Sequence, residues 1–406
     1  MPRAYLPLLL ALLTMVGPLG IDAYLPAFLA IESSLETSSL AVQQTLSVYL
    51  VTMSVMVLFY GALVDSFGRK RVLRIAMLGF AVSSVAAICA WNVGLLILAR
   101  AAQGVFAGAG MVVSRTIVQD LYKGAEAQRV MATMTMVFGV APALGPILGG
   151  GLLMVFGWRA IFVFLAGFSL LLWWASGKWL RETLPPSQRQ LFVPTVILAN
   201  YAKAFAHPVF MLRVLAIGFV FGGVSLYIGS ASAFIIGILG LSETDFGWLF
   251  IPMVTGMTLG AASARRWSRR VTPGKLVRIG FIMMFLSALI SVTVTLMMTP
   301  RVPWAVLPLG LYSFGIALSM PSLTLSALTL FPSNRGMASS MQSFTQMMVF
   351  AILSGALAPL LFDSAVKLAL GHLLTLAVAG LLWRWSRQLE RQREVRQAQA
   401  PGSGHE

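Results

Sequence analysis

The sequence predicts an all-α integral membrane protein that crosses the bilayer about twelve times, and three observations support this prediction. Of its 406 residues, 58% are hydrophobic and only 10% are charged, whereas an ordinary globular chain carries about 25% charged residues. Apolar runs of about 20 residues, the length of a spanning helix, recur along the whole chain. Most of the 29 Lys and Arg residues lie between these runs. We therefore expect the whole fold to lie in the bilayer.

Short Gly, Pro or charged turns separate the apolar runs. The predicted spans are residues 6–30, 44–64, 72–91, 95–116, 130–154, 159–180, 210–236, 246–264, 276–297, 304–328, 338–362 and 368–386. If the N-terminus is inside, only Arg159, Arg301 and Lys367 fall in the outer segments. Because basic loops stay on the cytoplasmic side, both termini are predicted to be cytoplasmic. The net charge of +16 is then topological, and no nucleic-acid partner is expected.

Two short sequences recur half a chain apart. Val72-Leu-Arg-Ile is matched by Leu276-Val-Arg-Ile, and Arg129-Val-Met-Ala-Thr is matched by Arg335-Gly-Met-Ala-Ser. Chance similarity between apolar helices could explain either match alone, but their agreement in spacing favours a duplication. We expect an N-terminal six-helix half, a cytoplasmic linker, a C-terminal six-helix half and a disordered cytoplasmic tail, at residues 1–180, 181–208, 209–388 and 389–406. Two such halves with a substrate path between them are a transporter architecture.

Ionisable residues inside a span are candidates for function because their desolvation is costly. Asp22 is the acid placed clearly inside a predicted span, and Arg100 lies at a similar depth in the fourth span. Pro26 lacks the N–H that would bond the carbonyl of Asp22, which predicts a loosened helix beside the acid. Burial disfavours a charged carboxylate and a nearby Arg favours it, so Asp22 could exchange a proton. The alternative is a permanent structural Asp22–Arg100 pair. Arg115 is expected to snorkel to the headgroups.

The sequence does not contain the residue patterns of several other kinds of functional site. The chain has one cysteine, Cys89, and three scattered histidines, so no disulfide framework and no metal site are expected. Neither the G-x-x-x-x-G-K-[ST] phosphate loop nor the H-E-x-x-H and G-x-S-x-G motifs occur. We therefore predict no cofactor and no enzymatic activity, and nothing indicates ATP as the energy source.

Two motifs predict constrained backbone. The turn after the second span reads G-x-L-x-D-x-x-G-R-K-R, and the fifth span is rich in small residues with two internal prolines. Glycine permits a tight reversal in the turn, and small residues permit close helix packing in the span. The conformational residues predicted from these motifs are Gly61, Asp65, Gly68, Arg69, Lys70, Arg71, Pro142, Gly145, Pro146 and Gly149.

With these residues placed, the chain resembles the major facilitator superfamily over its whole length. The turn 61–71 resembles the signature of its loop between helices 2 and 3, and Arg100-Ala-Ala-Gln103-Gly104 resembles its helix 4 motif. Gly145-Pro-Ile-Leu-Gly-Gly150 resembles the helix 5 motif of its drug:proton antiporters. More narrowly, four segments are similar to the Bcr/CflA family of multidrug exporters: Ile21-Asp-Ala-Tyr-Leu-Pro-Ala27, Gln44-Thr-Leu-Ser47, Arg115-Thr-Ile-Val-Gln-Asp120 and Gly157-Trp-Arg-Ala-Ile-Phe162.

The resemblance implies a multi-pass antiporter of the bacterial inner membrane that expels bicyclomycin- or chloramphenicol-like compounds as protons enter. It assigns proton coupling to Asp22 supported by Arg100, and a conformational latch to Asp65 with Arg69. It also assigns close packing of the fifth span against the opposite half to Gly145, Pro146 and Gly149. The second-half counterpart of the turn has Arg269 where an acid would mirror Asp65, so we expect an asymmetric latch.

The expected partners are a small-molecule substrate, protons and membrane lipid, and we expect a monomer. The residues predicted to line the substrate cavity are Gln103, Met134, Phe138, Tyr227, Trp248, Tyr312, Gln342 and Phe344, together with Asp22 and Arg100. Each aromatic or Met residue in this set could equally be core packing. A mostly apolar cavity suits amphipathic substrates better than sugars. A metabolite exporter or uptake symporter on the same fold is the alternative, and a channel, a receptor or an intramembrane enzyme fits less well.

Overall fold

A computed structural model describes residues 5–268, 270–332 and 334–399, and every regular element in those ranges is a helix. Twelve of its helical stretches are long and apolar enough to cross a membrane, as the sequence predicts. These stretches are Leu6–Ser34, Ser39–Phe67, Arg69–Ile88, Val93–Leu121, Arg129–Phe156, Arg159–Trp179, Pro208–Gly229, Gly247–Trp267, Pro273–Met297, Leu307–Leu328, Arg335–Leu360 and Ala365–Gln392.

Several spans are interrupted within the bundle. The first consists of α1 (Leu6–Thr14), α2 (Val16–Asp22), the 3₁₀ turn η1 (Leu25–Ala27) and α3 (Phe28–Ser34). The fourth consists of α6 (Val93–Ala107) and α7 (Ala109–Leu121), and the eleventh of α15 (Arg335–Ile352), the π-helix η4 (Leu353–Leu357) and η5 (Ala358–Leu360). The predicted loosening at Pro26 is confirmed, because regular α-helix ends at Asp22. A broken helix frees backbone groups that can serve a polar site.

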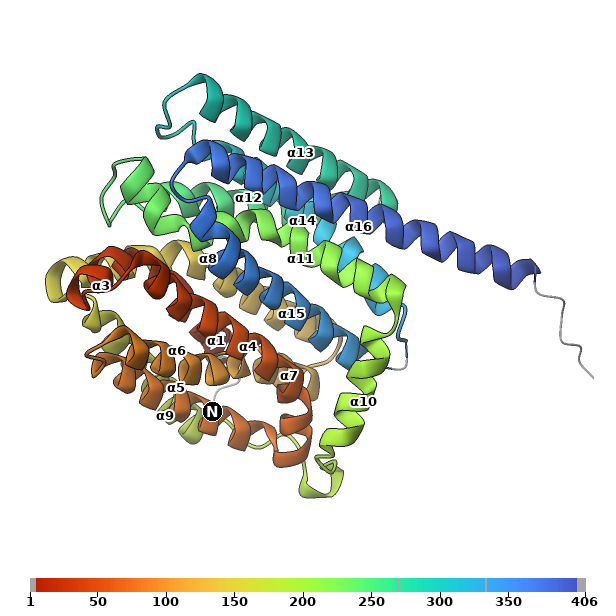
Figure 1. Ribbon diagram of the computed structural model, residues 1–406. Helices are drawn as coiled ribbons and strands as arrows, with labels where there is room; N and C mark the ends of the chain where they lie inside the picture. Colours follow the sequence, from red (N-terminus) through yellow and green to blue (C-terminus); the bar gives the residue numbers. More distant parts are fainter. Residues whose placement is uncertain (1–4, 269, 333, 400–406) are drawn as a thin grey trace, which may run out of the picture.

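The helices form two groups, one drawn in red to yellow and one in green to blue (Figure 1). The first group adds α4 (Ser39–Phe67), α5 (Arg69–Ile88), α8 (Gly124–Phe156) and α9 (Arg159–Trp179). The second contains α11 (Pro208–Gly229), the π-helix η3 (Ala233–Ile238), α12 (Gly247–Trp267), α13 (Pro273–Met297), α14 (Leu307–Leu328), α15 and α16 (Ala365–Gln399). The groups meet where α4 packs on α15 and α8 packs on α12.

We call the end of the bundle at the α4–α5 turn the basic end, since Arg69, Lys70 and Arg71 lie there, and the other end the opposite end. The connection between the groups runs along the basic end. Besides η2 (Pro186–Gln188), it contains the helix α10 (Pro194–Phe205), which the sequence did not predict. The Tyr201 hydroxyl donates to the carbonyl of Leu58 at 2.7 Å, and the Phe205 ring lies edge-on to Phe344 with centroids 6.3 Å apart. The helix α10 therefore contacts both groups (Figure 1).

The tail differs from the expectation of disorder after residue 388. The helix α16 continues to Gln399 and projects beyond its neighbours (Figure 1), while residues 400–406 lie outside the described ranges. Glu390 holds this extension by an ion pair to Arg213 at 2.5 Å. Arg213 lies near the start of α11, so the pair fixes the beginning of the extension to the second group.

Candidate functional site

The buried guanidinium of Arg100 is the centre of a polar cluster in the first group. Its carbon Cζ lies 4.5 Å from the ring centre of Tyr24 and 4.1 Å from that of Tyr49. One terminal nitrogen donates to Oε1 of Gln103 at 2.5 Å, and Nε2 of Gln103 donates to Ser84 at 2.7 Å. An Arg between two aromatic faces is stabilised by their π-electrons. The cluster therefore holds a positive charge without a carboxylate.

The tyrosines are themselves fixed by hydrogen bonds. The Tyr24 hydroxyl shares a 2.6 Å hydrogen bond with Thr45, and the Tyr49 hydroxyl donates to the carbonyl of Gly17 at 2.8 Å. Gly17 and Tyr24 belong to the broken first span, while Thr45 and Tyr49 belong to α4. These bonds tie the first span to the helix that packs against the second group.

Asp22 is the last residue of α2 and is buried, with 4% of its surface exposed. Among the described residues, no ion pair or hydrogen bond joins its carboxylate to Arg100 or to another side chain. The possible Asp22–Arg100 pair is therefore not formed in this structure, because the Tyr24 and Tyr49 rings occupy the faces of the guanidinium. Asp22 instead lies against α8.

The glycines of α8 allow this close approach. A Cβ atom added to Gly145 would lie 2.6 Å from the Cβ of Asp22, and one added to Gly149 would lie 2.0 Å from the carbonyl oxygen of Ala23. The resemblance assigned this packing to the opposite half, but Gly145 and Gly149 contact the first span of their own half. The next residue of α8, Gly150, faces the second group. A Cβ atom added to Gly150 would lie 2.5 Å from the carbonyl oxygen of Glu243. Pro142 and Pro146 lie inside α8, which remains continuous.

The turn at the basic end holds a network of charges. Arg69 is buried and binds Asp65 and Asp120, each at 3.0 Å. Its backbone N–H donates to Glu182 at 2.9 Å, and Gly68 forms the turn with a φ of 92°, which favours glycine. The predicted pairing of Asp65 with Arg69 is therefore present. Asp120, the last residue of the segment 115–120, adds α7 to the network.

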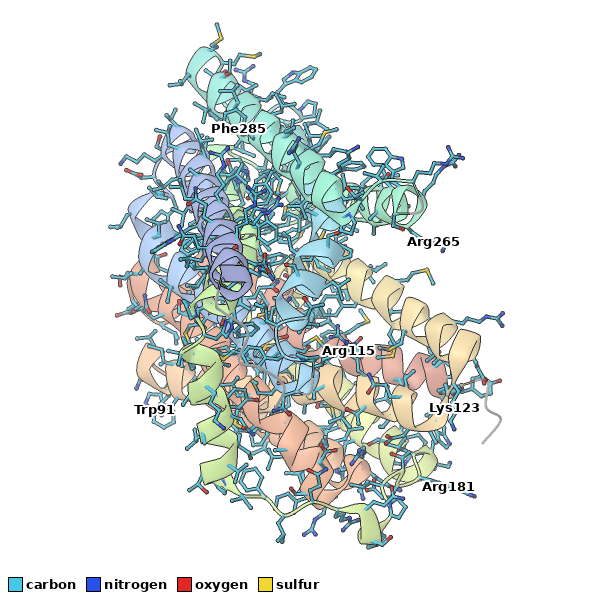
Figure 2. All side chains as sticks on the ribbon, turned by 90° about the vertical axis from the view of Figure 1, so that its right-hand side faces the viewer. Trp91, Arg115, Lys123, Arg181, Arg265 and Phe285 are labelled. Carbon is cyan, nitrogen blue, oxygen red and sulfur yellow. The ribbon has the colours of Figure 1, made fainter. Side chains whose placement is uncertain are left out.

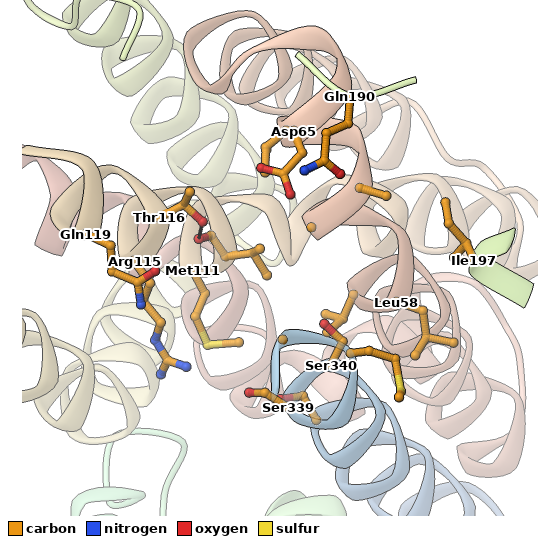
Figure 3. Close-up of a pocket in the computed structure, with 18 of the residues that line it drawn as sticks. Leu58, Asp65, Met111, Arg115, Thr116, Gln119, Gln190, Ile197, Ser339 and Ser340 are labelled. Carbon is orange, nitrogen blue, oxygen red and sulfur yellow. Dashed lines mark hydrogen bonds between the residues drawn. The ribbon is translucent and has the colours of Figure 1, made fainter. Parts of the chain in front are cut away.

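A cavity of about 550 Å³ lies beside this turn, between the two groups of helices. It is lined from α4, α7, α10 and α15, among others, and Asp65, Arg69 and Gly61 belong to its wall. In Figure 3, Ser339 and Ser340 on α15 face Met111 and Arg115 on α7 across this space. Figure 2, viewed toward the basic end, shows Arg115 between the two groups. The expectation that Arg115 snorkels to the lipid headgroups is therefore wrong, because its side chain reaches the cavity.

The side chains predicted to line the substrate cavity are dispersed, and none of them is in the wall of this cavity. Gln103, Met134, Tyr227, Tyr312 and Gln342 are buried, Phe138 and Phe344 are partly buried, and Trp248 is 45% exposed. Tyr312 donates to the carbonyl of Val220 at 3.0 Å, and both Tyr227 and Tyr312 pack on His372. Gln342 donates to Thr324 at 2.9 Å. The tyrosines therefore serve the packing of the second group in this structure.

The opposite end is closed by contacts between the groups. Nε2 of Gln43 donates to both the carbonyl and the hydroxyl of Ser354 at 2.8 Å, and Nε2 of Gln44 donates to the carbonyl of Gly355 at 2.9 Å. Both acceptors lie in η4, where the eleventh span departs from α-helical geometry. The molecule is therefore hollow between the groups at one end and sealed at the other.

Comparison with known proteins identifies the family that has this architecture. A family model described as Major Facilitator Superfamily matches residues 10–359. The chain belongs to the major facilitator superfamily. Its relatives include the bicyclomycin resistance protein homolog of Haemophilus influenzae, 28% identical over 94% of this chain and 96% of the relative. Multidrug resistance protein D of Escherichia coli is 29% identical over 91% of this chain and 92% of the relative, and both relatives are consistent with Bcr/CflA drug efflux.

Solved structures agree on the fold. A bacterial homolog to the human lysosomal transporter Spinster, solved in an inward-facing and unoccupied conformation, has a TM-score of 0.70 and 15% identity. The match covers 96% of this chain and 97% of the chain in that structure. This protein is accordingly a major facilitator of the bacterial inner membrane, a multi-pass transporter of small molecules rather than an enzyme.

For this transporter, the sequence missed several residues of the site. Arg115 and Asp120 are the ends of the segment 115–120, which was singled out only for its resemblance to a family. Asp120 joins the ion network and Arg115 joins the cavity wall because of how α7 is rotated. Gln43 precedes another noted segment and closes the opposite end. His372 is fully buried in α16, with Nδ1 3.2 Å from the carbonyl oxygen of Gly223. A histidine within an apolar run was the available signal for it.

Proposed function

We propose that this transporter exports small amphipathic compounds, including bicyclomycin- or chloramphenicol-like drugs, in exchange for protons by alternating access. The printed names of its relatives, a bicyclomycin resistance protein homolog and a multidrug resistance protein, support this substrate class. The basic end and both termini face the cytoplasm in this proposal, because Lys and Arg concentrate in cytoplasmic loops. The cavity beside Arg69 then receives substrate from the cytoplasm, and the seal at Gln43 faces outward.

The position of Asp22 is the observation that carries the proposal. Its carboxylate is buried beside a break in the first span, with no ion pair among the described residues. An uncompensated charge there is costly, so the acid is neutral while the site is dry. Asp22 takes up a proton while the site is open to the outside, and the proton leaves to the cytoplasm when water reaches the carboxylate from that side and stabilises its charged form. Alternation of the two halves thereby couples proton entry to export.

Arg100 acts as a fixed positive charge near this acid. Tyr49 lies within electrostatic range of both Asp22 and Arg100. In this structure the tyrosine faces and Gln103 contact the guanidinium of Arg100, while its Nε and one terminal nitrogen have no hydrogen-bond partner among the described residues. This arrangement supports proton exchange over the structural ion pair. Arg100 favours release of the proton whenever rearrangement brings the two groups closer.

The cavity wall supports amphipathic cargo. Leu58, Met111 and Ile197 supply apolar surface, while Arg115, other charged side chains and the α15 serines supply polar surface. Such a mixed wall suits amphipathic compounds, which carry both an apolar face and polar groups. The chain contains both halves of the path, so a monomer suffices for transport.

The Asp22→Asn substitution tests the proposal in inside-out vesicles with an acidic lumen. We expect drug accumulation driven by the pH gradient to fall to the level of vesicles without transporter, because Asn cannot exchange a proton. Equilibrium drug binding should persist, since Asp22 is outside the cavity wall. Asp363→Asn is the matched control, because Asp363 is an exposed acid paired with Lys367 at 2.6 Å.

Intact accumulation in the Asp22→Asn protein would show that Asp22 is not the coupling site. The direction and cargo of the flux distinguish the alternatives. Drug leaving the lumen together with protons would identify an uptake symporter. Gradient-driven flux of a cell metabolite, with none of any drug tested, would identify a metabolite exporter.

A further inference from the structure

A second concave site lies on the outside of the first group, at the basic end between α5 and α9. This site, which we call the α5–α9 pocket, has a volume of about 430 Å³ and is lined by Lys70, Arg71, Arg74, Ile75, Leu78, Trp173 and Glu182. Ile75 and Leu78 follow the basic residues along α5 and are 57% and 42% exposed. The pocket thus joins basic side chains to an exposed apolar surface.

The cations of the pocket are held in place but lack anionic partners. Nζ of Lys70 donates to the carbonyl of Gly177 at 2.9 Å, and Cζ of Arg74 lies 4.6 Å from the ring centre of Trp173. Within the described residues, none of Lys70, Arg71 and Arg74 forms an ion pair. The buried Nε of Arg74 has no hydrogen-bond acceptor there either. Three positive charges therefore lie close together without forming an ion pair to the protein.

Glu182, the acid in the pocket wall, is already engaged. Its carboxylate accepts from the backbone N–H groups of Arg69 and Lys70, at 2.9 and 3.2 Å, and from that of Thr183 at 3.0 Å. It thereby caps the N-terminus of α5, a position that favours negative charge. The capping carboxylate offsets part of the local charge, and the pocket keeps a positive excess.

The internal duplication shows that this arrangement is not a general consequence of basic loops. Arg278 is the counterpart of Arg74 in the repeated sequence 276–279. Arg278 is exposed, and among the described residues no aromatic ring lies beneath its guanidinium. Trp173 and the capping Glu182 therefore distinguish the first copy.

We propose that the α5–α9 pocket binds the phosphodiester headgroup of an acidic phospholipid in the leaflet at the basic end. The guanidinium of Arg74 and the ammonium of Lys70 donate to the phosphate oxygens, which are strong acceptors for such groups. Arg71 adds attraction to the headgroup, and basic pockets between spanning helices suit acidic lipids. An acyl chain lies along Ile75 and Leu78. Aromatic side chains such as Trp173 suit the interface between membrane and water.

The purified transporter in a neutral detergent tests this proposal by native mass spectrometry of lipid-bound protein. Phosphatidylglycerol should be retained more strongly than phosphatidylcholine of the same chains, and Arg74→Gln should reduce that retention about fivefold, the effect of one basic residue near an anionic surface. Arg278→Gln is the matched control and should leave retention unchanged. Arg71→Gln, at an exposed position, should give a smaller loss without disturbing the fold.

A competition experiment with inorganic phosphate distinguishes a bound lipid from a bound free anion. We expect phosphate alone to compete with phosphatidylglycerol only weakly, because it lacks chains to cover Ile75 and Leu78. Equal retention of the two lipids, or equal losses for Arg74→Gln and Arg278→Gln, would overturn the proposal. Displacement of phosphatidylglycerol by phosphate at a comparable concentration would overturn the assignment to lipid. Thermal unfolding of each variant without lipid shows whether it is folded.

Discussion

The two halves of this transporter share a helical plan but distribute their charges differently. The N-terminal half buries Asp22 and Arg100 deep in the bundle, around the rings of Tyr24 and Tyr49. In the C-terminal half, the buried ring of His372 lies against that of Tyr312, with centroids 4.0 Å apart. Two halves with a similar helical plan can therefore differ in which ionisable side chains they bury.

Both halves bury an arginine at the basic end, again with different partners. Arg69 binds two acids, Asp65 and Asp120, beside the cavity between the halves. Arg213 binds Glu390 and donates to the carbonyl of Ser326 at 2.5 Å, within the C-terminal half. The predicted asymmetry rested on Arg269, which lies outside the described residues. We therefore expect the Arg69 network to affect transport and the Arg213 network to affect stability.

The largest expected effect comes from Gly149→Ala. Its new methyl group would meet the Ala23 carbonyl at 2.0 Å, so α8 must move away from the first span beside Asp22. Overpacking of this kind costs about 1–3 kcal/mol, and we expect a lower melting temperature and a loss of most drug export. Gly151→Ala is the control on the same helix, because nothing lies within 4 Å of its added Cβ. Equal behaviour of the two variants would contradict the close packing of the first span on α8.

A smaller effect is expected from the pair Asp120→Asn and Glu390→Gln, which removes one acid from each arginine network. Asp120→Asn should lower the export rate several-fold, because the bond lost to Arg69 lies at the cavity wall. Glu390→Gln should lower the melting temperature slightly, by the equivalent of roughly 1 kcal/mol, and leave the export rate unchanged. Export assays and thermal unfolding of both variants measure the two effects. The functional distinction between the halves fails if Glu390→Gln slows export as much as Asp120→Asn does.

Much of the fold could be predicted because span number depends on the length of apolar runs alone. The break at Asp22 was predictable for a similar reason, since Pro26 acts on the backbone of its own helix. The Asp65–Arg69 pair joins residues four apart, which places them on one helical face. Each of these predictions needs only local sequence.

The contacts of the site could not be predicted because they depend on helix rotation. In a bilayer, apolar side chains face either lipid or protein, so hydrophobicity does not tell which face is buried. On α8, Met134 is 4% exposed and Met136 is 65% exposed, although both are equally apolar. Likewise, the depth of Asp22 and Arg100 suggested a pair, whereas rotation placed Tyr24 and Tyr49 on the guanidinium. Trp248 was assigned to the cavity from its residue type alone.

The smallest expected effect concerns the seal where the halves meet at the opposite end. Gln43→Ala removes both hydrogen bonds to Ser354, each with a net contribution of about 0.5–1.5 kcal/mol. Gln44 keeps its own bond to Gly355, so the seal weakens without being lost. We expect the population open at the opposite end to increase about fivefold or more, with little change in melting temperature.

Spin labels report this population. Trp91→Cys and Lys367→Cys place them on exposed positions of the two halves at the opposite end, in a Cys89→Ser background that removes the natural thiol. Gln43→Ala should add a longer distance to the measured distribution. Ser54→Ala is the control, since the Ser54 hydroxyl donates only within α4, to the carbonyl of Val51. An unchanged distribution in Gln43→Ala would mean that the packing of α4 on α15, rather than polar contacts between unlike halves, keeps this end closed.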